Sequence, residues 1–126
     1  MTKPALELIG LESADETVAL QMTRWLAYLR SERRLSPKTL EAYARDARQF
    51  FDFLCEHWGA RVTLARFSLL EASDVRAFMA MRRADDIAGR SLMRALAGLR
   101  SFGRFIEREV LSCSESALTA VLTSEV

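Results

Sequence analysis

The chain has 126 residues, the size of one ordinary domain, and 50% of them are hydrophobic, which is enough for a buried core. Its formal net charge is only +1, so the total charge gives no support for nucleic-acid binding, and such a function would require an uneven distribution of charge. The N-terminus has no apolar run long enough for a secretory signal, and no segment is apolar enough to span a membrane. We therefore expect a cytoplasmic protein without a membrane partner.

The sequence contains no recognisable catalytic or metal-binding set. The only histidine is His57, and a lone histidine near a helix end is typically solvated or locally bonded. Cys55 lies two residues before it, and residues two apart on a helix do not face each other. Cys55, His57 and the distant Cys113 match no zinc-binding pattern. In a reducing compartment we do not expect the two cysteines to form a disulfide. We expect no cofactor, no metal and no catalysis in this chain.

The first predicted helix runs from about Ala14 to Arg34. Ser13, followed three residues later by Glu16, fits a capping box at its start. Apolar residues then recur at helical spacing and form one stripe: Val18, Met22, Trp25, Leu26 and Leu29.

The second predicted helix has a sharper start and runs to about Trp58. Ser36 is a good cap residue, and Pro37 at the first helical position loses nothing by lacking an N–H. Gly59 is the predicted stop. The apolar side is formed by Leu40, Tyr43, Ala44, Ala47, Phe50, Phe51, Leu54 and Trp58, and the opposite side by Lys38, Glu41, Arg45, Arg48, Gln49 and Asp52.

Residues 60–70 form a predicted connection with room for a short turn. A third helix is expected from about Ala72 to Ala84, packed through Val75, Phe78 and Met79 and the aliphatic stem of Arg82. Residues 85–89 then turn the chain.

The fourth predicted helix, from about Arg90 to Glu109, carries the strongest charge pattern. At about 100° per residue its apolar side chains share an arc of roughly 120°: Leu92, Leu96, Leu99, Phe102 and Ile106. Five arginines share the opposite arc and surround the small Ala97 and Ser101: Arg90, Arg94, Arg100, Arg104 and Arg108. The near-neutral total charge therefore hides a basic helix face.

The sequence thus predicts an all-α fold, a compact bundle of four main helices. We expect an N-terminal extension at residues 1–13, one domain at 14–111 and a tail at 112–126, which either forms a short fifth helix or stays mobile. The aromatic residues fall on or beside the apolar stripes, so we interpret them as core and not as platforms for stacked bases.

The basic face has two interpretations. Charges on the outer side of an amphipathic helix are usually a solvated surface. This face, however, is nearly of one sign, whereas solvated helices usually intersperse acidic residues. Its small residues also allow close approach to a phosphate backbone, and arginine can bind a phosphate or a guanine edge through two hydrogen bonds. We therefore favour a nucleic-acid contact.

Three blocks together resemble the core-binding domain of tyrosine recombinases and phage-type integrases, and most closely that of Xer-type site-specific recombinases of bacteria. The resemblance covers roughly residues 16–111, and its blocks are RRLSPKTLEAYARDARQFFDFL, LEASDVRAFMA and GRSLMRALAGLRSFGRFIERE. It implies the SAM-like fold and a domain that closes on one side of duplex DNA. The catalytic tyrosine, arginines, lysine and histidines of the family belong to a separate C-terminal domain, and nothing here matches that set.

The resemblance also implies which residues contact DNA. On the second helix these are Lys38, Thr39, Ala42 and Arg45, with Ser36 near a phosphate. On the fourth helix they are Arg90, Ser91 and Arg94, with Ser101 further along, and Arg90 and Arg94 are the candidates for reading bases. The first helix, around Arg24, Arg30 and Arg33, is a candidate contact with neighbouring recombinase protomers.

The leading hypothesis is duplex DNA binding as one half of a recombinase clamp, in service of chromosome-dimer resolution. The alternative is a helical interaction module whose arginine face docks an acidic protein. A free-standing enzyme would need a catalytic constellation that the sequence lacks.

Overall fold

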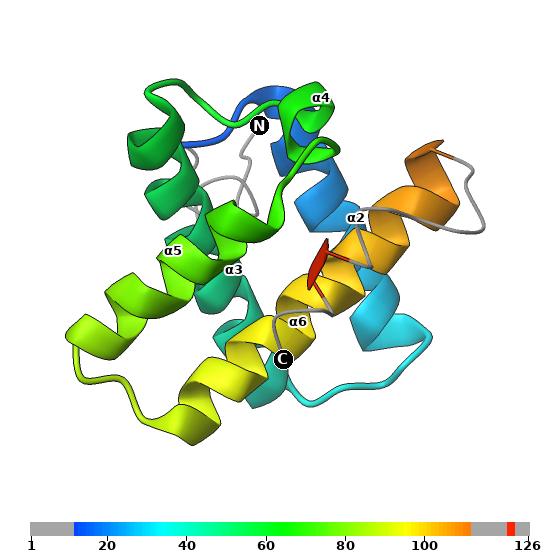
Figure 1. Cartoon of the computed structure of the whole chain (residues 1–126). Helices are drawn as coiled ribbons and strands as arrows, with labels where there is room; N and C mark the ends of the chain where they lie inside the picture. Colours follow the sequence, from blue (N-terminus) through cyan, green and yellow to red (C-terminus); the bar gives the residue numbers. More distant parts are fainter. Residues whose placement is uncertain (1–11, 112–120, 123–126) are drawn as a thin grey trace. The chain divides into compact units, whose positions relative to one another are not determined.

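The computed structural model describes residues 12–111 and 121–122. Their elements, in chain order, are α2 (Glu16–Ser31), α3 (Pro37–Trp58), α4 (Leu64–Phe67), α5 (Ala72–Ala84), α6 (Gly89–Ile106) and the π-helical turn η1 (Glu107–Leu111) (Figure 1). Within the described residues the structure has no β-strand. The predicted all-α class with four long helices is confirmed. The described chain divides into two compact units, one ending at Phe67 and the other beginning at Ser68.

The start of α2 differs from the prediction because the preceding backbone is extended. The N–H of Val62 donates to the Ser13 carbonyl (2.8 Å) and the N–H of Asp15 donates to the Val62 carbonyl (3.0 Å), so these residues form an isolated bridge with the α3–α4 connection. Asp15 is the cap instead of Ser13, and its carboxylate accepts from the N–H of Val18 at 3.2 Å. The predicted Ser13–Glu16 capping box is therefore wrong.

The α2–α3 connection is longer than predicted. Helix α2 ends at Ser31 and not at Arg34, which adopts a left-handed backbone conformation with a φ of 55° that interrupts the helix. The predicted start of α3 is confirmed, because Ser36 Oγ accepts from the N–H of Thr39 at 3.2 Å. The predicted stop is also confirmed, since Gly59 is left-handed with a φ of 74°.

Aromatic packing holds the first unit together. The rings of Trp25 on α2 and Tyr43 on α3 stack with their centroids 6.0 Å apart. The single turn α4 brings Phe67 edge-on to Phe50 (6.4 Å) and Phe51 (5.7 Å), and these three side chains are fully buried. The short turn expected between residues 60 and 70 thus contributes a core residue that the helical pattern of the long helices does not reveal.

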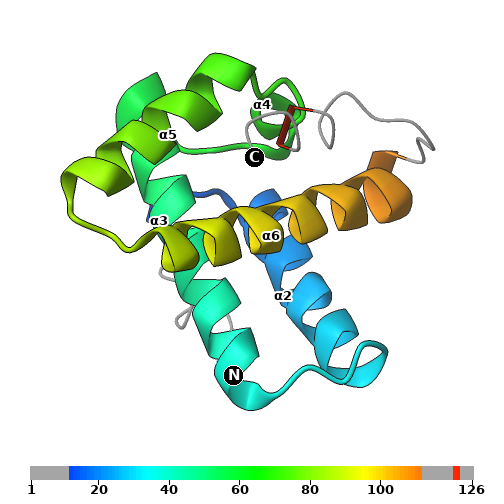
Figure 2. The ribbon, with the colours of Figure 1, turned by 60° about the horizontal axis from the view of Figure 1, so that its bottom comes forward.

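The second unit begins with α5, which a short loop connects to α6 (Figure 2). The predicted bounds of α5 are confirmed, and Val75, Phe78 and Met79 are buried as expected. The Glu71 N–H donates to the carboxylate of Asp74 at 2.9 Å, which closes a capping box at the start of the helix.

Helix α6 confirms the predicted separation of its two sides. All five apolar residues of the predicted arc are buried: Leu92, Leu96, Leu99, Phe102 and Ile106. The α-helix ends at Ile106, earlier than predicted, and the chain continues in the same direction as η1 (Figure 2). Apart from residues 121–122, which are helical, the predicted tail and its possible fifth helix lie outside the described residues.

Replacing Phe102 by alanine should lower the free energy of unfolding by roughly 3–5 kcal/mol, because this ring is fully buried (0% exposed) and its removal leaves a cavity. Met93→Ala on the same helix is the control, since Met93 is 41% exposed and should change stability by about 0.5 kcal/mol or less. Urea unfolding of both variants checks this. Equal effects would mean that α6 is rotated about its axis relative to the structure.

Candidate nucleic-acid interface

The first half of α3 presents two cations on either side of a small residue. Lys38, Ala42 and Arg45 are spaced by four and three residues, so they lie along one side of the helix. Lys38 and Arg45 are exposed, and Ala42 is half-buried. We call these three residues the α3 face. A side chain no larger than alanine between two cations leaves room for a flat or convex anionic surface.

The two hydroxyl groups implied by the resemblance serve the helix cap. Ser36 Oγ accepts from the backbone N–H of Thr39 and donates to Thr39 Oγ1 at 3.0 Å. Ser36 is exposed and Thr39 is half-buried. A phosphate contact by Ser36 would therefore have to share a hydroxyl that already starts the helix.

On α6 and η1 the arginine face comprises the five arginines of the predicted basic arc together with Ala97 and Ser101. Arg90, Arg104 and Arg108 are exposed, whereas Arg94 and Arg100 are half-buried. Ala97 and Ser101 are half-buried between them. Two small, half-buried residues therefore lie between the exposed cations of this face.

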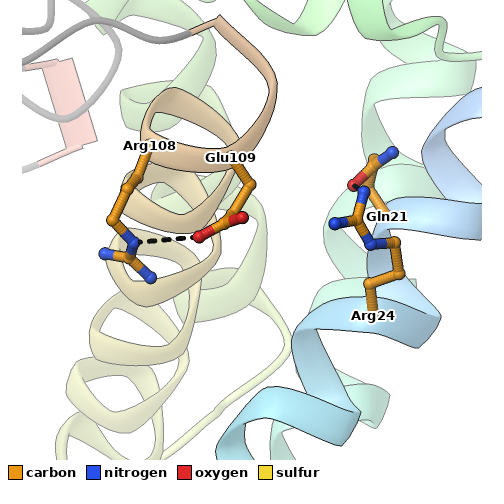
Figure 3. Close-up of polar contacts among 4 residues, drawn as sticks. All are labelled: Gln21, Arg24, Arg108 and Glu109. Atoms are coloured by element: carbon orange, nitrogen blue, oxygen red, sulfur yellow. Dashed lines mark hydrogen bonds and ion pairs between the residues drawn. The ribbon is translucent and has the colours of Figure 1, made fainter.

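The arginines of this face differ in what they already bind. Arg90 and Arg104 make no hydrogen bond or ion pair with any residue that the structure describes. Arg94 and Ser101 each take part in other interactions within the protein. Arg108 Nε lies 3.3 Å from a carboxylate oxygen of Glu109, and this pair is solvent-exposed (Figure 3). Arg90 and Arg104 are thus the cations most available to an external anion.

The N-terminus of α6 adds backbone donors beside Arg90. The cap position is Ala88, whose side chain has no hydrogen-bond acceptor, and Leu92 is the first residue of the helix to donate back to it, at 3.1 Å. A side chain built at Gly89 would meet no atom within 4 Å. The first N–H groups of a helix favour anions, so this end of α6 suits a phosphate.

The structure brings most of the predicted site residues onto these two faces, but not all of them. Ser91 is one residue after Arg90, about 100° around the helix, and lies away from the centre of the arginine face. Arg100 and Arg104 belong to the face, although the resemblance does not point to them. Helical periodicity is the sequence signal that places them there.

The described residues of the first unit also include an acidic cleft, a hydrogen-bonded arginine and an exposed histidine. A cleft of about 560 Å³ is lined by Glu12, Ser13, Asp52, Cys55, Glu56 and Gly59, and its three carboxylates give it the wrong sign for phosphate. On α2, Arg24 Nη1 donates to Gln21 Oε1 at 3.3 Å, and both side chains are seen in Figure 3. His57 is exposed and stacks on Phe53 with 5.0 Å between ring centroids.

Neither a metal site nor a membrane-spanning helix is found where the structure is described. Residues 12–111 and 121–122 contain no group of three or more potential metal ligands. None of the helices in this part of the chain is long and apolar enough to cross a bilayer.

Comparison with known proteins identifies the family. Residues 22–110 match the model of the phage integrase N-terminal SAM-like domain. The chain is 75% identical over 109 residues to a tyrosine recombinase XerC of Bradyrhizobium diazoefficiens. The matched region covers 86% of the chain and 34% of that protein. It is 57% identical over its full 126 residues to the tyrosine recombinase XerC of Nitrobacter winogradskyi, of which it covers 39%.

The similarity extends to more distant relatives, including the tyrosine recombinase XerC of Methylobacterium nodulans at 46% identity over 125 residues. No solved structure matches the chain. The chain spans between a third and two fifths of the length of these relatives. The matched family model covers most of the described helices, and the chain therefore belongs to the phage integrase N-terminal SAM-like domain family, in its Xer-type tyrosine recombinase branch.

Proposed function

We propose that residues 14–111 form the DNA-binding domain of a site-specific tyrosine recombinase, which contacts duplex DNA through the α3 face and the arginine face. The observation that carries this proposal is the pair Arg90 and Arg104. Both are exposed, neither has a partner among the described residues, and they stand on either side of the small Ala97 and Ser101. The DNA-cleaving chemistry would belong to the rest of the recombinase.

Electrostatics supplies most of the proposed affinity. Each arginine or lysine that neutralises a phosphate releases condensed counterions, so binding weakens steeply as salt increases. The N-terminus of α6 adds backbone N–H donors to the same anion. The α3 face contributes Lys38 and Arg45 in the same way, with Ala42 allowing close approach. Contacts of this type position the domain on DNA but do not by themselves select a sequence.

Base reading is proposed for Arg90 and Arg94. Both belong to the first two turns of α6, and arginine can bind a guanine edge through two hydrogen bonds. Arg94 is half-buried and engaged within the protein, so its guanidinium has to exchange an existing contact to read a base. Ser91 and Ser101 are the proposed polar neighbours on DNA, with Thr39 and Ser36 in the equivalent role on α3.

The biological role that we propose is resolution of chromosome dimers in the bacterial cytoplasm, together with further recombinase protomers. Arg24, Arg30 and Arg33 of α2 and its following loop are exposed, and they are the proposed contact with a neighbouring protomer. A domain that binds only one side of the duplex lacks the avidity of the whole recombinase, so we expect weak binding by this chain alone.

Replacing Arg90 and Arg104 together by alanine should weaken binding to a duplex of about 30 base pairs by about 10- to 100-fold, because a base contact of Arg90 and a phosphate contact of Arg104 are lost. The salt slope should decrease by about 1, for the one phosphate contact. Fluorescence anisotropy at several salt concentrations measures both. Arg76→Ala, which removes an exposed arginine from α5, is the matched control and should change neither quantity appreciably.

Two results would contradict the proposal. If the double variant binds as tightly as the unaltered protein while its circular-dichroism spectrum is intact, the arginine face does not contact DNA. If the unaltered protein binds no duplex even at high concentration and low salt, the domain is not a DNA-binding module. That second result would favour docking of an acidic protein on the arginine face.

Substituting Ala88 tests the role of the α6 N-terminus. Ala88→Asp and Ala88→Ser each supply the missing cap acceptor and should stabilise the protein by about 1 kcal/mol. Only aspartate adds a negative charge where we place a phosphate, so Ala88→Asp should weaken DNA binding by about tenfold at low salt. The serine variant should bind nearly as tightly as the unaltered protein. Equal DNA affinities for the two variants would exclude a phosphate at this helix end.

A further inference from the structure

Arg100 is the one arginine of the arginine face with a guanidinium nitrogen withdrawn from solvent and left without an acceptor. The residue is half-buried, and its Nη1 atom is fully buried with no hydrogen-bond partner among the residues that the structure describes. Arg90 and Arg104 differ from it because they are exposed to water. Arg108 differs because it pairs with Glu109.

This arrangement is unfavourable in the free protein for two reasons. A buried N–H without an acceptor loses its hydrogen bonds to water and gains none in return, and the penalty is larger when the group is charged. Arg104 lies four residues further along the helix, at a spacing where like charges repel. Nothing among the described residues offsets this cost, and an anion brought by another molecule would.

We propose that Arg100 is a latent phosphate ligand, which rests on the proposed DNA-binding function. On the DNA complex its guanidinium turns outward and binds a phosphate beside the one bound by Arg104. The side chain is long and flexible, so this movement needs a change of rotamer and no movement of α6. Binding would then supply the acceptor that Nη1 lacks among the described residues.

The geometry favours a nucleic acid over a protein carboxylate as the source of the anion. Arg100 and Arg104 lie one helical turn apart, about 6 Å along the axis. A DNA strand carries successive phosphates, about 3.4 Å apart along the duplex axis, so one strand can offer a separate acceptor to each of the two guanidinium groups. A single carboxylate would serve only one of them and leave the other cation unmatched.

Arg100→Met tests the inference, because methionine keeps an aliphatic stem but removes the charge and the orphaned donor. We expect its thermal midpoint to rise by about 4 °C, while its DNA affinity falls by about tenfold and the salt slope decreases by about 1. Arg100→Lys, which keeps the charge, should retain the salt slope. Arg76→Met on α5 is the matched control for DNA binding, for which the affinity and the salt slope should not change appreciably.

The outcomes separate this inference from the proposed function. If Arg100→Met binds DNA as the unaltered protein does, while the Arg90 and Arg104 double variant loses affinity, the inference is overturned and the proposed function stands. A lower thermal midpoint for Arg100→Met would also overturn it, because Arg100 would then stabilise the free protein. Failure of the unaltered protein to bind any duplex would overturn both.

Discussion

Burial of one side of α6 fixes the rotation of this helix about its axis, and the proposed site depends on that rotation. Leu96, Phe102 and Ile106 are fully buried and recur at helical spacing. With these side chains turned inward, the arc of arginines centred on Ala97 has to face outward. The hydrophobic effect on one side of the helix thus determines where the guanidinium groups on the other side stand, without any specific contact between the arginines.

Burial of one side also fixes the rotation of α3 about its axis, through a different set of contacts. The stacking of Trp25 on Tyr43 and the burial of Phe50 set the rotation of α3 within the first unit. The Ser36 cap and Pro37 fix where the helix begins, so Lys38 falls in its first turn. Core packing and capping together position the α3 face. Of its three residues only Ala42 is partly buried.

The parts of the fold that depend on local periodicity could be predicted from the sequence. The bounds of α5, the Ser36 cap and the buried stripe of α6 are examples, because each is encoded within one helix. The cap at Asp15 could not be predicted, since it depends on a bridge between Ala14 and Val62, which lie far apart in the chain. The end of α2 was missed because a left-handed arginine has no reliable sequence signal.

The candidate site shows the same division. Periodicity alone places Arg104 on the outer side of α6, and the structure adds that Arg104 has no partner among the described residues. The half-buried state of Arg94 and the orphaned Nη1 of Arg100 could not be predicted, because they depend on how neighbouring side chains pack around a long flexible stem. Charge pattern therefore identifies the face, and tertiary packing decides which of its cations are available.

The most direct test of the central claim is to map the surface that meets DNA. Amide chemical shifts of the ¹⁵N-labelled protein would be followed by nuclear magnetic resonance during titration with a recombination-site duplex. The proposed interface predicts the largest changes at residues 36–45 of α3 and 88–104 of α6, with little change along α5. Changes concentrated on α5, with the amides of residues 88–104 unaffected, would contradict it.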